Sequence, residues 1–137
     1  MTALSSPWSA SDTAMLPKTI LVTDDHAHIL KLVEYSLEEI NCWIETARTG
    51  EEAVAKAGRM QIDLLVVDVK LPGIDGFETV RQIKSKEKHR DLPVIILTGQ
   101  GQSDVQAQAA GLGVTAFFTK PFSPNELSTT ARKLLSL

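Results

Sequence analysis

The chain lacks several features that would have pointed to particular classes of protein. Its 137 residues include one cysteine, Cys42, so no disulfide can form within the chain, and we expect a cytoplasmic setting. No apolar run approaches the roughly 18 residues of a membrane span. The first residues lack the basic and apolar regions of a secretory signal. Charge is mixed, with 17 acidic and 14 basic residues and no basic block, so we expect neither a nucleic-acid nor a membrane partner.

The organisation along the chain is simple. Residues 1–17 are rich in Ser, Thr and Ala and show no hydrophobic periodicity, which predicts a flexible N-terminal tail. Residues 18–137 alternate between apolar runs and amphipathic stretches. A segment of this length is enough for one domain with a substantial core.

Short runs rich in Val, Ile, Leu and Phe indicate buried strands, and the stretches between them have helical spacing, so the chain should build βαβ units. The expected strands are 19–23, 43–46, 63–67, 93–97 and 115–119. The expected helices are 28–40, 50–58, 77–84, 103–110 and 124–135. Thr49 with Glu52, and Ser123 with Glu126, match the capping-box pattern at two of the helix starts.

Four of these strands are followed by, or end on, polar residues of a kind that phosphate chemistry uses. The residues are Asp24 and Asp25, then Asp68, then Thr98, then Lys120. Ligands of open α/β sheets bind at the carboxyl ends of the strands. We therefore expect these five side chains to converge on one edge of the sheet.

Three carboxylates at one edge repel one another, by up to about 4 kcal/mol per pair at 4 Å and an effective dielectric constant of 20. Either their pKa values rise or a cation lies among them. Mg²⁺, or Mn²⁺, suits such oxygen ligands. Asp68 follows the most apolar strand and is the best-placed nucleophile for forming an aspartyl phosphate. Thr98 and Lys120 could then contact phosphate oxygens.

Each of these residues taken alone has an ordinary structural explanation, and the combination in this order is what is specific. The chain resembles a response-regulator receiver domain of the CheY-like kind from about Lys18 to Leu135. The matching motifs are Asp24-Asp25, Asp68 with Leu71-Pro72-Gly73-Ile74-Asp75-Gly76, Thr98-Gly99 and Lys120-Pro121-Phe122.

This resemblance implies a doubly wound (βα)5, flavodoxin-like α/β fold with a five-stranded parallel sheet of order 2-1-3-4-5. It implies that Asp68 accepts a phosphoryl group from a sensor histidine kinase or a histidine phosphotransfer protein. Asp25 and Asp68, the backbone carbonyl of Lys70 and a water held by Asp24 would place Mg²⁺.

The resemblance also assigns roles on the other side of the site. Thr98 and Lys120 would bind the phosphoryl oxygens, and the Lys120–Pro121 bond would be cis. Phe117 falls where the family has its aromatic switch residue, which is often Tyr, and would act together with Thr98.

Lys70 and Gln100 lie two residues after Asp68 and Thr98, at variable positions that tune the phosphate lifetime in such domains. The three histidines are interpreted more plainly. We expect His26 and His28 to be solvated loop and helix-start residues rather than metal ligands, since residues two apart cannot share a helix face. We expect His89, in a charged loop, to lie on the surface.

The function expected on these grounds is that of a single-domain response regulator that is not an enzyme beyond its own phosphorylation and dephosphorylation. It would signal to a downstream protein through the face made by 103–110, 115–119 and 124–135. A phosphorelay intermediate or a phosphate sink stays open as an alternative. A receiver-like domain that is never phosphorylated is disfavoured, because the chain has the complete set of Asp24, Asp25, Asp68, Thr98 and Lys120.

Two other classes fit less well. A metal-dependent phosphatase of the haloacid dehalogenase kind needs an aspartate where this chain has Lys70. A flavodoxin-like cofactor module should not carry Asp24 and Asp25 in its phosphate loop, because they would repel the phosphate.

Overall fold

The computed structural model describes residues 17–99 and 102–137. The strands in these residues form one five-stranded parallel sheet. They are β1 (Lys18–Thr23), β2 (Cys42–Ala47), β3 (Leu64–Asp68), β4 (Val94–Thr98) and β5 (Ala116–Thr119). Their order is β2-β1-β3-β4-β5, which confirms the predicted doubly wound arrangement. The expected N-terminal tail and Gln100 lie outside the described residues.

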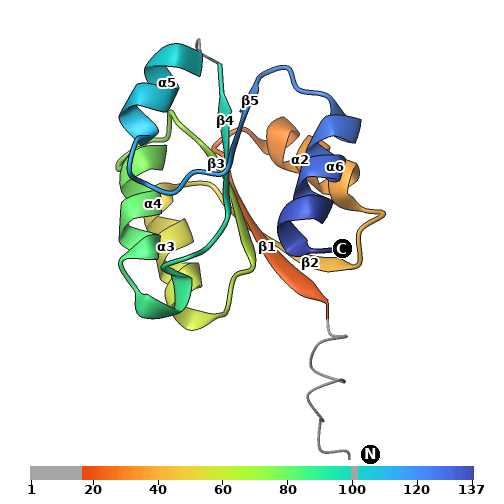
Figure 1. Cartoon of the computed structure of the whole chain (residues 1–137), viewed down its shortest axis with the longest axis horizontal. Helices are drawn as coiled ribbons and strands as arrows, with labels where there is room; N and C mark the ends of the chain where they lie inside the picture. The colour runs from red at the N-terminus through yellow and green to blue at the C-terminus, as the bar shows by residue number, and fades with distance from the viewer. Residues whose placement is uncertain (1–16, 100–101) are drawn as a thin grey trace, which may run out of the picture.

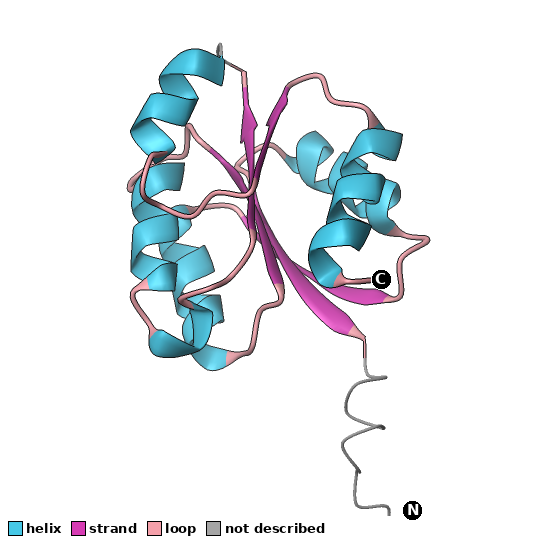
Figure 2. Ribbon diagram, in the orientation of Figure 1, coloured by secondary structure: helices cyan, strands magenta, loops and turns pink. Residues whose placement is uncertain are grey.

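Helices cover both faces of this sheet. They are α2 (Ala27–Leu37), α3 (Gly50–Arg59), α4 (Gly76–Lys84), α5 (Gln102–Ala109) and α6 (Pro124–Leu135), with a 3-10 turn η1 (Glu87–His89). Helices α3, α4 and α5 lie on one face, and α2 and α6 on the other (Figure 1). Figure 2 shows the resulting three layers, with the sheet in the middle.

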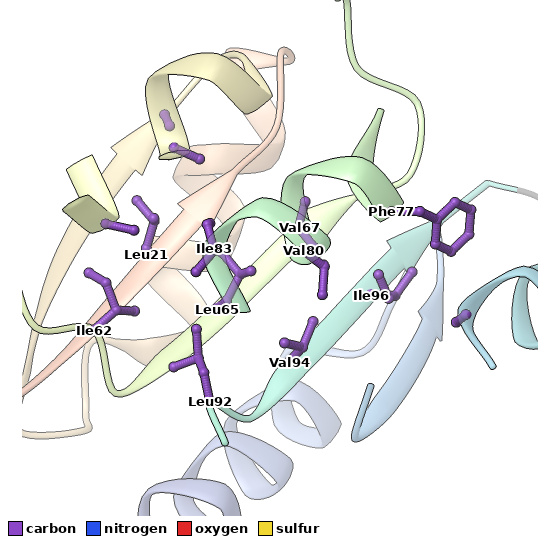
Figure 3. Packing of buried hydrophobic residues seen from close by; sticks show 14 of the residues in the cluster. Leu21, Ile62, Leu65, Val67, Phe77, Val80, Ile83, Leu92, Val94 and Ile96 are labelled. Carbon is purple, nitrogen blue, oxygen red and sulfur yellow. The ribbon is translucent and has the colours of Figure 1, made fainter. Parts of the chain in front are cut away.

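The core consists of two apolar layers, one on each face of the sheet. Successive residues of each central strand enter opposite layers: Leu21 packs toward α3 and α4, whereas Ile20 and Val22 pack toward α2 and α6. Figure 3 shows side chains of the strands and of α4 meeting in the first layer. Burial on both faces explains why the strands are continuous apolar runs rather than alternating ones. Each such side chain contributes about 1.5–3 kcal/mol to folding.

Both predicted helix caps are present. The hydroxyl of Thr49 accepts a hydrogen bond from the Glu52 N–H at 3.0 Å, and that of Ser123 accepts one from the Glu126 N–H at 3.2 Å. The return bond of the first capping box is displaced by one residue, because the Glu52 carboxylate accepts from the Arg48 N–H at 2.9 Å. This bond is the main cause that lowers the pKa of Glu52.

The predicted end of the first helix was wrong. Helix α2 stops at Leu37, not at residue 40, because its last turn tightens: the Glu38 N–H donates to the Tyr35 carbonyl and the Ile40 N–H to the Leu37 carbonyl. Ile40 is nevertheless buried, as the apolar pattern predicts, although it lies in the turn after the helix. Helix α3 runs to Arg59, one residue past its expected end at Gly58.

His89 was wrongly predicted to lie on the surface. It is 1% exposed, and its Nε2 accepts a hydrogen bond from the Ile62 N–H at 3.0 Å. This bond requires the tautomer that carries its proton on Nδ1, and Nδ1 is buried without a hydrogen-bond partner among the described residues. The imidazole joins the end of η1 to the segment that leads into β3.

The pH dependence of stability should reveal this histidine. Burial, and to a lesser extent the charge of Lys88, lower the pKa of His89, with Asp63 opposing them. The unfolded chain therefore takes up a proton near its ordinary pKa of about 6.5 while the folded protein does not, so stability is lost as the pH falls through that value. We predict that His89→Gln is less stable than wild type by about 1–3 kcal/mol at pH near 7.5, and that this gap narrows toward pH 5.5.

Urea unfolding at several pH values measures both quantities. His28→Gln, which alters an exposed histidine, is the matched control and should keep the wild-type pH slope. A slope that is the same for His89→Gln and wild type would show that His89 does not contribute to it.

Candidate functional site

The register of the sheet brings the polar strand ends to one edge. Thr98, the last residue of β4, lies opposite Thr119 of β5, and Asp68, the last residue of β3, lies opposite Leu97. The Lys120 N–H donates to the Thr98 carbonyl at 2.7 Å, which continues the β4–β5 ladder past the last strand residue. Residues from four separate strands thereby reach one place.

Lys120 lies between two of the carboxylates. Its Nζ is 2.8 Å from Asp24 Oδ2 and 3.3 Å from Asp68 Oδ2. The side chain of Asp24 is fully buried and that of Asp68 is 6% exposed, whereas Lys120 keeps 18% of its side chain accessible. One ammonium thus offsets part of the charge of two buried carboxylates, whose burial without a compensating charge would be costly.

The direction of the pKa shift of Asp68 indicates that Lys120 compensates the buried negative charge only in part. Burial, chiefly, and then the charge of Asp24 raise the pKa of Asp68 above its usual value. Lys120 and the backbone N–H of Lys70 act in the opposite direction and do not cancel the rise. A negative charge on Asp68 is therefore costly in the metal-free protein, and a further cation would stabilise it.

Asp25 and His26 form the outer side of the same cluster. Asp25 Oδ1 is buried and has no hydrogen-bond partner in residues 17–99 and 102–137, although His26 Nδ1 lies 3.2 Å away. His26 also donates its backbone N–H to Asp24 Oδ1 at 2.9 Å, and its Nδ1 lies 3.1 Å from the same oxygen.

The predicted position of His26, exposed at the start of a helix, is confirmed, and the structure adds a contact with the carboxylates that the sequence did not predict. His26 precedes α2, and 54% of its side chain is exposed, but its Nδ1 faces the carboxylates. The rings of His26 and His28 meet edge to face with centroids 5.7 Å apart, because His26 lies outside the helix and the helix-face argument does not apply to it.

These side chains fit a divalent cation. Asp24, Asp25, His26 and Asp68 each offer one ligand atom, and the four atoms lie within 4.8 Å of one another. A hard cation with carboxylate ligands would satisfy the buried Asp25 oxygen and offset the charge that Asp68 carries at a cost.

The turn after Asp68 is tightly folded. Gly76 donates its N–H to the Val69 carbonyl at 2.8 Å, and a Cβ at position 76 would overlap the Asp68 carbonyl oxygen. Only glycine fits there. Asp75 then caps α4 by accepting the Glu78 N–H at 2.8 Å. This turn fixes the backbone that carries Asp68 and Lys70.

The remaining predicted site residues surround this cluster at different depths. Lys70 is exposed, and its N–H bonds the Asp68 carboxylate. Thr98 is fully buried at the end of β4. Phe117 is half-buried and packs against the core layer of α3, α4 and α5. The Lys120–Pro121 peptide bond is cis.

Comparison with known proteins agrees with this geometry. A sequence model described as the response regulator receiver domain matches residues 20–132. Among curated proteins, the transcriptional regulatory protein ResD of Bacillus subtilis is 39% identical over 116 residues, which are 85% of this chain and 47% of ResD. The alkaline phosphatase synthesis transcriptional regulatory protein PhoP of the same organism is 36% identical over 86% of this chain and 48% of its own length.

Two solved structures show the same fold. The chemotaxis protein CheY4 of Vibrio cholerae superposes with a TM-score of 0.81 at 29% identity, over 87% of this chain and 99% of CheY4. The receiver domain of the sensor histidine kinase PA1611 of Pseudomonas aeruginosa superposes with a TM-score of 0.79 at 25% identity, over 88% of this chain and 99% of that domain. That structure holds a magnesium ion coordinated in its active-site cleft.

The relatives also bear on the expected partners. The chain spans about half the length of the curated relatives it matches, and several of these are named as transcriptional regulators. One, RpaA of Synechocystis, is named as DNA-binding. The expectation of no nucleic-acid partner therefore has no support from the relatives. Within the described part of the chain, no helix combines the length and apolar character that a membrane crossing requires.

The sheet order, the lysine between two buried carboxylates and the match over residues 20–132 lead to one family. The chain belongs to the response-regulator receiver domains of two-component signalling systems.

Proposed function

We propose that this protein is a Mg²⁺-dependent phosphoacceptor, in which Asp68 takes a phosphoryl group from a sensor histidine kinase or a histidine phosphotransfer protein. The observation that carries the proposal is the position of Lys120 Nζ, 2.8 Å from Asp24 and 3.3 Å from Asp68. Asp25 belongs to the same acidic cluster, and its buried Oδ1 has no hydrogen bond within residues 17–99 and 102–137. The magnesium ion in the PA1611 receiver supports the choice of cation.

The transfer itself needs little covalent chemistry from the protein. An oxygen of the Asp68 carboxylate attacks the phosphorus, the P–N bond of the donor phosphohistidine breaks, and its electron pair leaves with the imidazole nitrogen. Lys120 stabilises the charge on the transferred oxygens, and its contact with Asp68 keeps the nucleophile oriented. Thr98 would donate its hydroxyl to a second phosphoryl oxygen.

The cation ligands in this proposal are Asp25, Asp68 and the backbone carbonyl of Lys70, with Asp24 acting through a water. Mg²⁺, or Mn²⁺, held by these ligands would supply positive charge to offset that of the phosphoryl oxygens. Asp24 suits an indirect role because its oxygens are already engaged by Lys120 and by the His26 N–H.

The signal to a downstream protein would follow from a change in the positions of Thr98 and Phe117. We propose that Thr98 shifts toward the phosphoryl group and that Phe117 rotates inward into the vacated space. Helix α5 is suited to follow this change, since its buried apolar side chains among residues 104–109 are Val105 and Ala109. The α5, β5 and α6 face would then present a different surface to a downstream protein.

The wider assignment is also proposed. Residues 18–137 would form the receiver domain. The protein would act in the cytoplasm and would catalyse only its own phosphorylation and dephosphorylation.

The first prediction concerns the phosphorylated residue. Incubation with a small acyl-phosphate donor and Mg²⁺ should add one base-labile phosphoryl group, at Asp68, because this carboxylate lies beside Lys120 and in the same cluster as Asp24 and Asp25. Intact-mass measurement before and after mild base reports it, with Asp68→Asn as the unlabelled control. Label that persists in Asp68→Asn would refute the assignment.

The second prediction concerns the cost of the charge cluster. Burial and Asp24 raise the pKa of Asp68, so its ionised form destabilises the folded protein at pH values above that pKa, and the effect disappears as the pH falls through it. Asp68→Asn should therefore stabilise the metal-free protein at neutral pH by on the order of 1 kcal/mol.

Thermal and urea midpoints in the presence of a chelator measure this gain. Adding Mg²⁺ should reduce it, because the ion stabilises wild type more than the variant. A lower midpoint for Asp68→Asn without metal would show that Lys120 already overcompensates the repulsion.

The third prediction concerns the lifetime of the aspartyl phosphate. Lys70 is exposed beside Asp68, and we propose that its side chain lies across the phosphoryl oxygens and obstructs the attacking water. Gln100, the other position expected to tune the lifetime, carries no charge to activate that water. Lys70→Ala and Lys70→Asn should dephosphorylate about two- to fivefold faster, the equivalent of an ionic contact of about 0.5–1 kcal/mol.

Single-turnover decay of the phosphorylated proteins at saturating Mg²⁺ gives these rates. Lys86→Ala, which removes an exposed lysine in the η1 region, is the control for a general change of charge. Decay of both Lys70 variants at or below the wild-type rate would rule out shielding.

A further inference from the structure

The imidazole of His26 lies where a ligand of the cation site would lie. Its Nδ1 is 3.1 Å from Asp24 Oδ1 and 3.2 Å from Asp25 Oδ1, and it belongs to the same four-residue cluster as Asp68. The side chain enters from the solvent side, with 54% of its surface exposed. Its Nε2 can therefore keep its proton toward water while Nδ1 offers a lone pair to the cluster.

The spacing is that of neighbouring ligands on one ion. Two adjacent donors of an octahedral cation with bonds of about 2.1 Å are about 3.0 Å apart. The 3.2 Å from His26 Nδ1 to Asp25 Oδ1 comes close to this value, and the buried Asp25 Oδ1 has no hydrogen bond within the described residues that would hold it back from a metal.

We propose that His26 Nδ1 is a direct ligand of the divalent cation, so that this site contains a nitrogen donor among its carboxylate oxygens. Imidazole binds first-row transition ions far better than it binds Mg²⁺, which prefers oxygen ligands. His26 therefore shifts the selectivity of the site from Mg²⁺ toward ions such as Mn²⁺ and Ni²⁺. The inference rests on the proposed function only in taking this cluster to be the cation site.

A second geometry competes with this one. If Nδ1 carries the proton, it donates a hydrogen bond to Asp24 or Asp25 and never touches the ion. His26 would then orient the carboxylates, and its loss would weaken the binding of all divalent ions to a similar degree. Selectivity, rather than affinity alone, separates the two geometries.

Calorimetric titration of the tag-free, unphosphorylated protein with Mg²⁺, Mn²⁺ or Ni²⁺ alone measures that selectivity. His26→Asn should weaken Ni²⁺ binding by at least about tenfold. It should change Mg²⁺ affinity by less than about threefold, because the asparagine oxygen is an adequate ligand for a hard ion. Mn²⁺ should fall between the two.

His28→Asn is the matched control. His28 is exposed, lies next to His26 in space and is outside the four-residue cluster, so its replacement should leave all three affinities unchanged. Equal losses for Mg²⁺ and Ni²⁺ in His26→Asn, or no loss for either, would overturn direct ligation.

A spectroscopic measurement tests the bond itself. The electron spin echo of Mn²⁺ bound to wild type should be modulated by a directly coordinated nitrogen, and the pattern should change when the protein contains ¹⁵N-histidine. The modulation should be absent in His26→Asn and retained in His28→Asn. A wild-type signal without nitrogen coupling would overturn the proposal.

These measurements use no phosphoryl donor, so their outcome is separate from that of the phosphoacceptor assignment. A protein that is phosphorylated at Asp68 and shows no nitrogen coupling refutes the role of His26 alone. A protein that binds Ni²⁺ through His26 and is never phosphorylated refutes the proposed function alone.

Discussion

The ammonium of Lys120 between Asp24 and Asp68 is the interaction on which the site depends. The two carboxylates are almost fully buried, and buried charges of one sign are tolerated only beside a compensating charge. Lys120 supplies one positive charge for two negative ones, and the raised pKa of Asp68 shows that the deficit remains. Because of this deficit of positive charge, a cation that binds at the site would stabilise the ionised form of Asp68.

The fold places this interaction at small cost to the core. Lys120 and Asp24 are 96 residues apart in the chain, and they meet because parallel strands all end at one edge. The central strands β1, β3 and β4 can be apolar over most of their length because α2 and α6 cover one face and α3, α4 and α5 the other. The charged residues of the site thus lie at the last residue of a strand or just beyond it, and the apolar layers below hold them in position.

The sequence was sufficient for the features that repeat or pair locally. Apolar runs identified each strand to within one or two residues, and the spacing of Ser123 with Glu126 identified the start of α6. The sequence was insufficient to predict the orientation of single side chains in loops and short turns. His89 turns inward to accept the Ile62 N–H, and His26 turns toward Asp24, because of partners that only the folded chain brings near. The early end of α2 has the same origin, since Ile40 reaches the core from a turn.

Phosphorylation of Asp68 would change the balance of charge around Lys120, and the packing of the sheet limits which elements can shift in response. It replaces a buried carboxylate by a phosphoryl group of about two negative charges, and Lys120 must then divide its contacts between that group and Asp24. The central strands cannot rearrange in response, because Val66, Ile96 and their neighbours are fully buried between two helical layers. The adjustment therefore falls on the elements at the margin of the sheet. Strand β5 is an edge strand with half-buried side chains, and α5 has few buried apolar contacts, so these two elements can shift without opening the core.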